Sequence, residues 1–436
     1  MKFLLKTNTY AITLWLFLAA GATAAGLEPV WSLAQKEKPL LIETLKELVA
    51  IESGSRELEE LDKIAKVIAA RLRALGGKVE LIEPAEADTV RLSDTPEKIG
   101  KMVKATFTGS GTKKILLMAH MDTVYPRGMA TQQPFRIDGD RAYGLGIADN
   151  RHGIAVILHS IAMLNAMKFR DYGTITVFIN ADEEIGSPGS RNHHTRLGSQ
   201  HDAVMSFEGG GNDKDDRVRL ATSGHALALL TVRGRASHAG SAPEKGVNAL
   251  DELAHQILQM RDLSDPKTGV KVNWTLARAG LVFNMIPPGA QATGDVRVAR
   301  IADYDGIEQK LKERVKNKLL PDAHVELVFE RRFPPLEPKP SSPALSAHAQ
   351  TIYAEIGRKL NVLEDSAGGF TDAANASLKT QAPVIEGFGL HGFGSHTTNA
   401  EYIVMSSIEP RLYLTTRMLM DIATGKAPLA PLVPRQ

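Results

Sequence analysis

The stretch Thr174-Ile175-Thr176-Val177-Phe178-Ile179, followed by Asn180-Ala181-Asp182-Glu183-Glu184, is the most informative part of the sequence. Six successive apolar or β-branched residues predict a buried strand. The strand leads into two adjacent glutamates and then the turn Gly186-Ser187-Pro188-Gly189. Charges at the end of a buried strand need partners such as a metal ion, an arginine or water. We therefore expect the rest of the chain to supply partners for Glu183 and Glu184, which could divide cation binding and proton transfer between them.

The composition is that of an ordinary globular protein with more than one domain. The chain has 436 residues, of which 43% are hydrophobic and 23% are charged. A net charge of +2 gives no electrostatic reason to expect nucleic acid or an acidic membrane as a partner. The absence of cysteine excludes a thiol nucleophile, a disulfide framework and a thiolate metal site. A metal here must be held by His, Asp and Glu, which suits zinc, manganese or cobalt.

The first 25 residues have the order of an export signal. Lys2 and Lys6 precede the apolar run Ala11–Ala20, small residues follow, and Ala22-Thr23-Ala24 is a plausible cleavage site. An uncleaved anchor is the alternative, although the apolar run is short for a membrane span. We expect residues 1–25 to be removed. The mature protein would then be exported, periplasmic or secreted, with no stable membrane association.

Strand and helix patterns alternate on both sides of a central insertion. This alternation predicts an α/β layer with a mostly parallel central sheet and flanking helices, in which ligands bind at the carboxyl ends of the strands. The expected strands are Lys78–Ile82, Met102–Thr108, Ile115–His120, Thr174–Ile179, Ala203–Phe207 and Pro383–Glu386. The expected helices are Leu40–Val49, Leu58–Leu75, Gly153–Met167, Pro343–Leu360, Asp372–Leu378 and Ile408–Ala423.

The pattern changes to long alternating runs at about Val218. Two helices among such runs predict an inserted α+β domain with an antiparallel sheet, residues 218–331, between catalytic parts 26–217 and 332–436. The proline-rich stretch Arg332–Pro340 would form a stiff linker. The runs are Val218–Val232, Lys271–Asn284 and Gln291–Val298, and the helices are Asn248–Met260 and Asp303–Lys316.

Histidine and carboxylate residues recur at the predicted strand ends and loops. Period two places His120 and Asp122 on one face, where a carboxylate could orient a metal-binding imidazole. Taken singly, such residues are ambiguous: Asp149 could cap a helix, and Glu208 and His396 could be loop residues. Taken together with Glu183 and Glu184, they could hold two metal ions about 3.5–4 Å apart and leave one glutamate as a base.

This order of residues resembles the co-catalytic dizinc exopeptidases, a family that includes aminoacylases, desuccinylases and glutamate carboxypeptidases. It is most similar to the bacterial glutamate carboxypeptidases of the carboxypeptidase G type, which remove C-terminal glutamate from folates. The similar stretches span nearly the whole mature chain. They are His120-Met121-Asp122-Thr123-Val124-Tyr125, Asp171-Tyr172-Gly173-Thr174-Ile175-Thr176-Val177, Ala236-Ser237-His238-Ala239-Gly240, Gly246-Val247-Asn248-Ala249-Leu250 and Thr371-Asp372-Ala373-Ala374.

The resemblance implies a role for each matched residue. Two Zn²⁺ per subunit, or Mn²⁺ or Co²⁺, would be held by His120 and Glu208 on one side, Glu184 and His396 on the other, and Asp149 between them. Glu183 would be the general base, and Asp122 would orient His120. The inserted domain would form a homodimer in which His238 reaches into the partner's active site. Substrate-binding residues would be Asn284, Arg297, Gly368 and Gly369.

The implied reaction releases a C-terminal amino acid, with glutamate expected, from a folyl, N-acyl or peptidyl substrate that has a free carboxylate. The alternatives are an aminoacylase or dipeptidase of the same family and a non-catalytic binding protein. The dinucleotide-like Gly387-Phe388-Gly389-Leu390-His391-Gly392 is followed by no helix pattern, and neither a Gly-x-Ser-x-Gly nor a His-Glu-x-x-His motif occurs.

The sequence departs from the carboxypeptidase G pattern at two places. Asn150-Arg151-His152 replaces Asp-Lys-Gly after the expected bridging aspartate, where the family has a cis peptide. Phe370 replaces a third loop glycine, which could narrow the substrate pocket.

Overall fold

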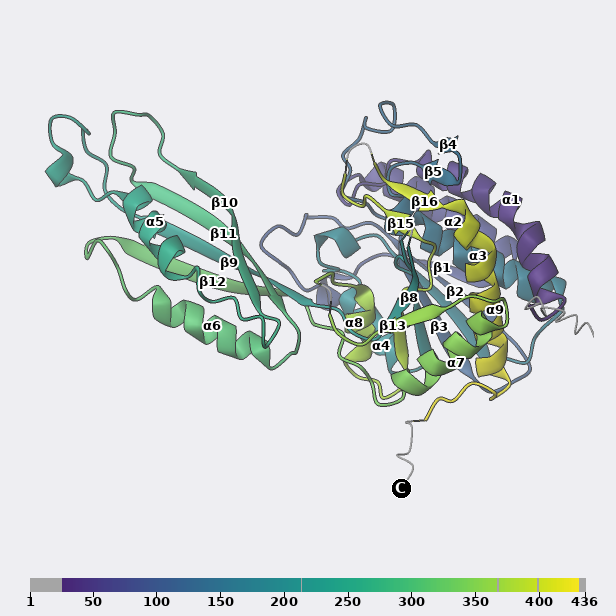
Figure 1. The fold of residues 1–436 in the computed structure, drawn as a ribbon. Helices are drawn as coiled ribbons and strands as arrows, with labels where there is room; N and C mark the ends of the chain where they lie inside the picture. The colour runs from purple at the N-terminus through teal and green to yellow at the C-terminus, as the bar shows by residue number, and fades with distance from the viewer. Residues whose placement is uncertain (1–25, 213, 367, 398–399, 431–436) are drawn as a thin grey trace, which may run out of the picture.

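The computed structural model describes residues 26–430, apart from residues 213, 367, 398 and 399. The expected export signal, residues 1–25, lies outside this range. Among the described residues, no helix combines the length and the apolar character needed to cross a bilayer. The chain forms a large lobe around one mixed sheet and a smaller lobe that extends away from it (Figure 1).

The large lobe is built on an eight-stranded sheet with the order β1-β2-β6-β3-β7-β14-β8-β13. Its central strands β6, β3, β7 and β14 are mutually parallel, while β1 and β2 run antiparallel at one edge. This confirms the predicted fold class. The strands are β1 (Lys78–Ile82), β2 (Met102–Thr108), β3 (Lys114–His120), β6 (Thr174–Asn180), β7 (Ala203–Ser206), β8 (Asp216–Arg219), β13 (Leu360–Leu363) and β14 (Val384–Glu386).

Helices cover both faces of this sheet. Along β3 the alternate residues Ile115, Leu117 and Ala119 pack into one buried cluster, and Leu116 and Met118 pack into another. The first cluster contains residues of α1 (Val30–Val49), α2 (Leu58–Ala74), α3 (His152–Ala166), α7 (Ser342–Ala354) and α9 (Ile408–Ala423). The second contains residues of α4 (Arg191–Gly198) and α8 (Asp372–Ser377). Because both faces are buried, the strand reads as a continuous apolar run.

The small lobe is a four-stranded antiparallel sheet with the order β10-β11-β9-β12, covered on one face by two helices. Alternate residues of β9 pack under α5 and α6, as the period-two pattern predicted. The chain enters and leaves this lobe side by side, where Thr222 and Leu336 form a β-bridge. The elements are β9 (Gly224–Arg233), α5 (Ala249–Gln259), β10 (Lys271–Ala279), β11 (Gly289–Val298), α6 (Asp303–Arg314) and β12 (His324–Phe333).

Several sequence expectations need correction. The predicted run Val218–Val232 is two strands: Val218 lies in β8 of the central sheet, and the antiparallel sheet begins with β9 at Gly224. Helix α1 begins at Val30 and continues through Pro39, because Ala34 before the proline and Leu41 after it are both buried in the core. Helix α4 was not predicted.

A third, small sheet was also not predicted. Its order is β15-β16-β5-β4, and its strands are too short to show a periodic pattern. They are β4 (Arg136–Asp138), β5 (Arg141–Tyr143), β15 (Gly392–Phe393) and β16 (Tyr402–Val404). Short helical turns occur at Glu86–Asp88, Ile147–Arg151 (η2), Glu183–Ile185 (η3), Pro243–Lys245 and Met405–Ser407.

Candidate metal centre

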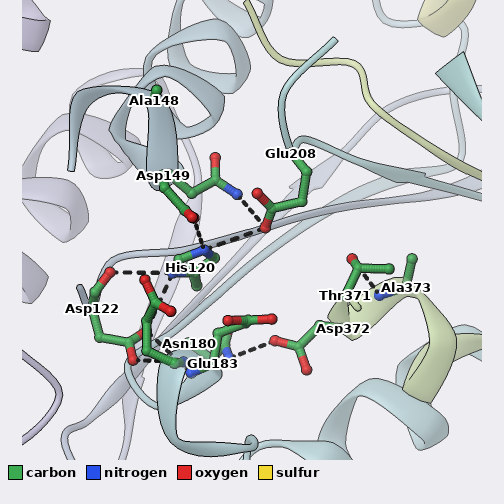
Figure 2. A network of polar contacts seen from close by, with 12 residues as sticks. His120, Asp122, Ala148, Asp149, Asn180, Glu183, Glu208, Thr371, Asp372 and Ala373 are labelled. Atoms are coloured by element: carbon green, nitrogen blue, oxygen red, sulfur yellow. Dashed lines mark hydrogen bonds and ion pairs between the residues drawn. The ribbon is translucent and has the colours of Figure 1, made fainter. Parts of the chain in front are cut away.

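The carboxyl ends of three adjacent parallel strands bring the predicted polar residues together. In the order β6-β3-β7, strand β3 ends at His120, β6 leads into Glu183 and Glu184 on η3, and β7 leads into Glu208. Figure 2 shows His120 between Asp149 and Glu208, with Asp122 and Glu183 on its other side. The sheet thus positions these side chains at the edge where parallel sheets bind ligands.

The two carboxylate oxygens of Asp149 face two different sets of side chains. Its Oδ1 lies 3.0 Å from His120 Nε2, which is also 3.3 Å from Glu208 Oε1. Its Oδ2 lies 3.3 Å from His396 Nε2, which is also 3.2 Å from Glu184 Oε2. Asp149 therefore stands between two similar His–Glu pairs.

Asp149 is presented by an irregular turn that a distant carboxylate holds in place. The peptide bond between Asp149 and Asn150 is cis. The backbone N–H groups of Gly146 and Ala148, just before it, each donate a 2.8 Å hydrogen bond to Glu401. Glu401 is 2% exposed, so its carboxylate is hydrogen-bonded to the turn rather than to solvent.

Asp122 connects His120 with the turn that carries the two glutamates. Its Oδ1 lies 3.3 Å from His120 Nδ1, and the backbone N–H groups of Glu183 and Glu184 each donate a 3.1 Å hydrogen bond to its carboxylate. The hydroxyl of Ser55 donates a third hydrogen bond to it, at 2.8 Å. A carboxylate with this many donors is held in one orientation, and it leaves His120 Nε2 directed at Asp149.

The electrostatics of the cluster are those of a cation site. Five buried or half-buried carboxylates, namely Asp122, Asp149, Glu183, Glu184 and Glu208, surround two imidazoles. Burial raises the pKa of Glu208 and Glu184 to about 7, and it raises the pKa of Glu183 well above its usual range. Asp149 and Glu184 raise the pKa of His396 to about 10.

One atom of the cluster has no partner. Glu184 Oε1 is buried and, among the described residues, accepts no hydrogen bond. Ligand atoms of His120, Asp149 and Glu184 also lie within 4.8 Å of one another. An excess of buried negative charge and an orphaned carboxylate oxygen are what bound divalent cations would balance, so the residues present fit the expected metal site.

Two of the predicted functional residues lie in the small lobe, away from this cluster. His238 and Asn284 are both exposed, and their segments are joined by a 3.0 Å hydrogen bond from the backbone N–H of Ala239 to Asn284 O. The backbone N–H groups of Gly240 and Ser241 donate to His238 Nδ1, each at 3.1 Å, so the neutral ring carries its proton on Nε2. Among the described residues, neither side chain contacts the metal centre of its own chain.

Arg297 and the glycine loop meet at the junction of the lobes. The guanidinium of Arg297 makes two 2.8 Å hydrogen bonds to Asp295 and a third, 3.2 Å, to Gly368 O. Its charge is therefore already balanced by a neighbour two residues away on the same strand. Gly369 and Phe370 line a cavity together with Asp149 and Glu208.

Sequence reasoning missed several residues around this centre. Glu401, Tyr125 and Ser55 were not identified as parts of it, and Asn150, noted only as a departure, donates a 2.7 Å hydrogen bond to Glu208 Oε1. For Asn150 and Ser55 no sequence signal existed. Glu401 follows the loop that contains His396, so its proximity to that histidine was the available clue.

The comparisons with known proteins agree with this fold and site. The profile of peptidase family M20/M25/M40 matches residues 116–421. Carboxypeptidase G2 of Pseudomonas sp. (strain RS-16) is 40% identical over 422 residues, 97% of this chain and 99% of that protein. Acetylornithine deacetylase of Proteus mirabilis is 28% identical over 52% of this chain and 56% of its own length.

A solved structure has the same fold. It is the YXEP protein of Bacillus subtilis, described as a dinuclear metal-binding peptidase of the M20 family. The YXEP chain aligns with a TM-score of 0.61 and 15% identity, and the alignment covers 89% of the present chain and 99% of the YXEP chain.

An α/β sheet with a His–carboxylate cluster at its carboxyl edge defines a metallohydrolase, and the two lobes are those of an exopeptidase fold. The chain belongs to peptidase family M20/M25/M40. The resemblance inferred from the motifs, and the assignment to the hydrolases, are thereby confirmed.

Proposed function

We propose that this protein is a metallo-carboxypeptidase that uses two divalent metal ions, zinc in the first place, to release a C-terminal amino acid from an amide. One observation carries the proposal: each oxygen of Asp149 faces its own His–Glu pair. His120 and Glu208 would hold one ion, Glu184 and His396 the other, and Asp149 would bridge them. Such ions lower the pKa of a water towards neutrality and polarise the scissile carbonyl.

Glu183 is the proposed general base. It is buried beside the ligand Glu184, and burial holds its pKa well above the usual range. A carboxylate with a raised pKa is suited to take a proton from the attacking water and pass it to the departing amine nitrogen. Asp122 would fix both partners, because it holds the backbone of Glu183 and the ring of His120.

The role proposed for His238 requires a second subunit. His238 would reach the active site of a partner chain in a homodimer formed by the small lobe and donate from Nε2 to the developing oxyanion. Its Nδ1 accepts two backbone N–H groups, which supports this assignment because it leaves Nε2 as the donor. Asn284 and Arg297 would contact the main-chain carboxylate of the substrate, and Gly368 and Gly369 would line the pocket.

The expected substrates carry glutamate at the C-terminus, on a folyl, N-acyl or peptidyl group. The 40% identity to a carboxypeptidase over nearly the whole chain supports this choice. The match to an acetylornithine deacetylase over half the chain makes an N-acyl-amino-acid hydrolase the second candidate. The order of residues in the first 25 positions supports export to the periplasm or medium.

A panel of substrates tests the proposal. N-benzoyl and N-(p-aminobenzoyl) derivatives of glutamate, glutamine, alanine and ornithine, together with N-acetylornithine, would be assayed with the zinc-loaded protein and again after chelation. We expect chelator-sensitive release of the C-terminal amino acid, fastest for glutamate. Hydrolysis that survives complete metal removal would contradict the metal-dependent mechanism. A preference for N-acetylornithine over every N-aroyl substrate would favour the second candidate.

A further inference from the structure

The cavity beside the metal centre contains one cationic side chain that no predicted role accounts for. Its volume is about 330 Å³, which is at the lower end of small-molecule sites. Its lining includes Asp149, Glu208, Glu386 and Phe370. Of the described residues that line it, Arg219, the last residue of β8, is the one arginine or lysine.

Arg219 lacks a carboxylate partner. Its Nη1 donates a 2.7 Å hydrogen bond to the carbonyl of Gly209, and no Asp or Glu oxygen among the described residues lies within 4.0 Å of it. The side chain is half-buried, so its charge is only partly solvated. A guanidinium in this setting retains donors that suit an incoming anion.

The neighbouring acidic residue Glu386 faces Arg219 from the adjacent strand β14, and its negative charge stabilises the guanidinium, although the two form no ion pair within 4.0 Å among the described residues. Its Oε1 accepts the backbone N–H groups of Glu208, at 3.0 Å, and Gly387, at 2.6 Å. Its Oε2 accepts the hydroxyl of Thr371. Oε1 thus supports the loop that carries Glu208, Oε2 supports Thr371, and Arg219 keeps its place in the lining of the cavity.

Phe370 lines the same cavity and also contacts the guanidinium of Arg297. Its ring is stacked on Phe333, with centroids 4.5 Å apart, and on His225, with centroids 5.1 Å apart. Arg297 lies 4.9 Å from the centroid of Phe370, is paired with Asp295 and does not line the cavity. Arg297 therefore lies outside the lining of the cavity to which Arg219 belongs.

We propose that Arg219 binds the side-chain carboxylate of the released amino acid and so makes the enzyme selective for an acidic C-terminal residue. The inference rests on the proposed reaction, and it assigns the side chain to the Arg219 cavity while the main-chain carboxylate is left to Arg297. The two carboxylates of a C-terminal glutamate would then be bound by two guanidinium groups, those of Arg219 and Arg297.

Glutamate and glutamine provide the sharpest test, because their side chains have the same shape and differ in charge. For zinc-loaded wild-type protein we expect kcat/KM for an N-aroyl glutamate to exceed that for the matching glutamine by at least about 10-fold. In Arg219→Gln most of that ratio should be lost, because kcat/KM falls for the glutamate substrate and not for the glutamine substrate. Arg219→Lys should retain part of the ratio. Arg73→Gln, at an exposed arginine of α2, should leave the ratio unchanged.

Binding of the free products gives a readout that does not depend on turnover. Calorimetry with the zinc-loaded proteins should show weaker binding of L-glutamate to Arg219→Gln than to wild type, and equal binding of L-glutamine. An equal loss for both amino acids would place Arg219 at the main-chain carboxylate and contradict the inference, as would an unchanged Glu/Gln ratio. If wild type hydrolyses neutral C-terminal residues as fast as glutamate, the reaction stands and the role of Arg219 is refuted.

Discussion

The phenol hydroxyl of Tyr125 donates a 2.7 Å hydrogen bond to the buried carboxylate of Glu401 and lies 2.9 Å from the carbonyl oxygen of Thr397. Glu401 also accepts the N–H groups of Gly146 and Ala148. One pair of side chains thus ties together the loop after β3, the turn that presents Asp149 and the loop that presents His396. Neither residue is a candidate metal ligand, yet both fix the backbone from which two candidate ligands project.

Replacing Glu401 should therefore weaken metal binding without removing a ligand. In Glu401→Gln the amide cannot accept both N–H groups as the carboxylate does, so we expect metal affinity to fall about 10- to 100-fold. Tyr125→Phe should have a smaller effect. Competition with a fluorescent chelator measures both affinities, and Glu43→Gln, at an exposed position of α1, is the matched control. A wild-type metal affinity in Glu401→Gln would show that the turn that presents Asp149 keeps its conformation without the Glu401 carboxylate.

Substitution of Asp122 should lower activity more than substitution of a carboxylate that only orients a metal-binding histidine. Asp122→Asn replaces one acceptor oxygen with an amide N–H that meets the donors of Glu183, Glu184 or Ser55. We expect kcat to fall about 100-fold or more, because the base and His120 are displaced together. Ser55→Ala, which removes one donor, should cost much less. Steady-state kinetics at saturating zinc checks both, and equal effects of the two changes would argue against the shared-carboxylate account.

His152 gives a prediction about stability and pH. Its ring is fully buried, lies with Nε2 3.0 Å from Ala148 O and accepts Leu390 N–H at Nδ1. Burial lowers its pKa to about 4 from the usual 6.5. Between pH 4 and pH 6.5 the His152 ring binds a proton in the unfolded chain but not in the folded chain. The free energy of unfolding should therefore decrease as pH falls from 6.5 to 4, by up to about 3 kcal/mol.

Denaturation curves of the metal-free protein at several pH values measure this dependence without a contribution from metal release. His152→Gln cannot titrate, so its stability should fall less steeply over the same interval. A slope identical to that of wild type would mean that other groups cause the acid sensitivity.

The proposed role of His238 predicts complementation between two inactive variants. In a mixed dimer of His238→Ala and Glu183→Gln chains, one active site combines an intact base with an intact histidine from the other chain. Random mixing should therefore restore about a quarter of wild-type activity. Size-exclusion chromatography with light scattering would establish dimer formation. Mixed dimers that stay inactive would show that His238 does not act across the interface.

The site could largely be anticipated because its residues follow strands whose apolar pattern is unambiguous. The runs that end at His120, before Glu183 and before Glu208 are buried on both faces, so their ends fixed where the polar groups would meet. The balance between Arg297 and Asp295 was also readable, since residues two apart on a strand share a face.

Other features had no local signal. Glu401 accepts hydrogen bonds from backbone N–H groups that are far away in the sequence, such as that of Gly146. No local sequence pattern therefore distinguishes its carboxylate from other carboxylates. Helix α1 continues past Pro39 because tertiary burial outweighs a local preference. That Arg219 forms no ion pair within 4.0 Å among the described residues became visible only when the hydrogen bonds of Glu386 were known.

The most direct test of the central claim measures metal content and turnover in one variant. Glu183→Gln keeps all five proposed ligands and removes the base. After reconstitution with zinc, mass spectrometry should find two zinc ions per chain in this variant and in wild type. Its kcat on an N-aroyl glutamate should be lower by about 10²-fold or more. Two zinc ions with nearly normal turnover, or a loss of one ion on mutation, would contradict the assignment of Glu184 to the metal and Glu183 to the proton.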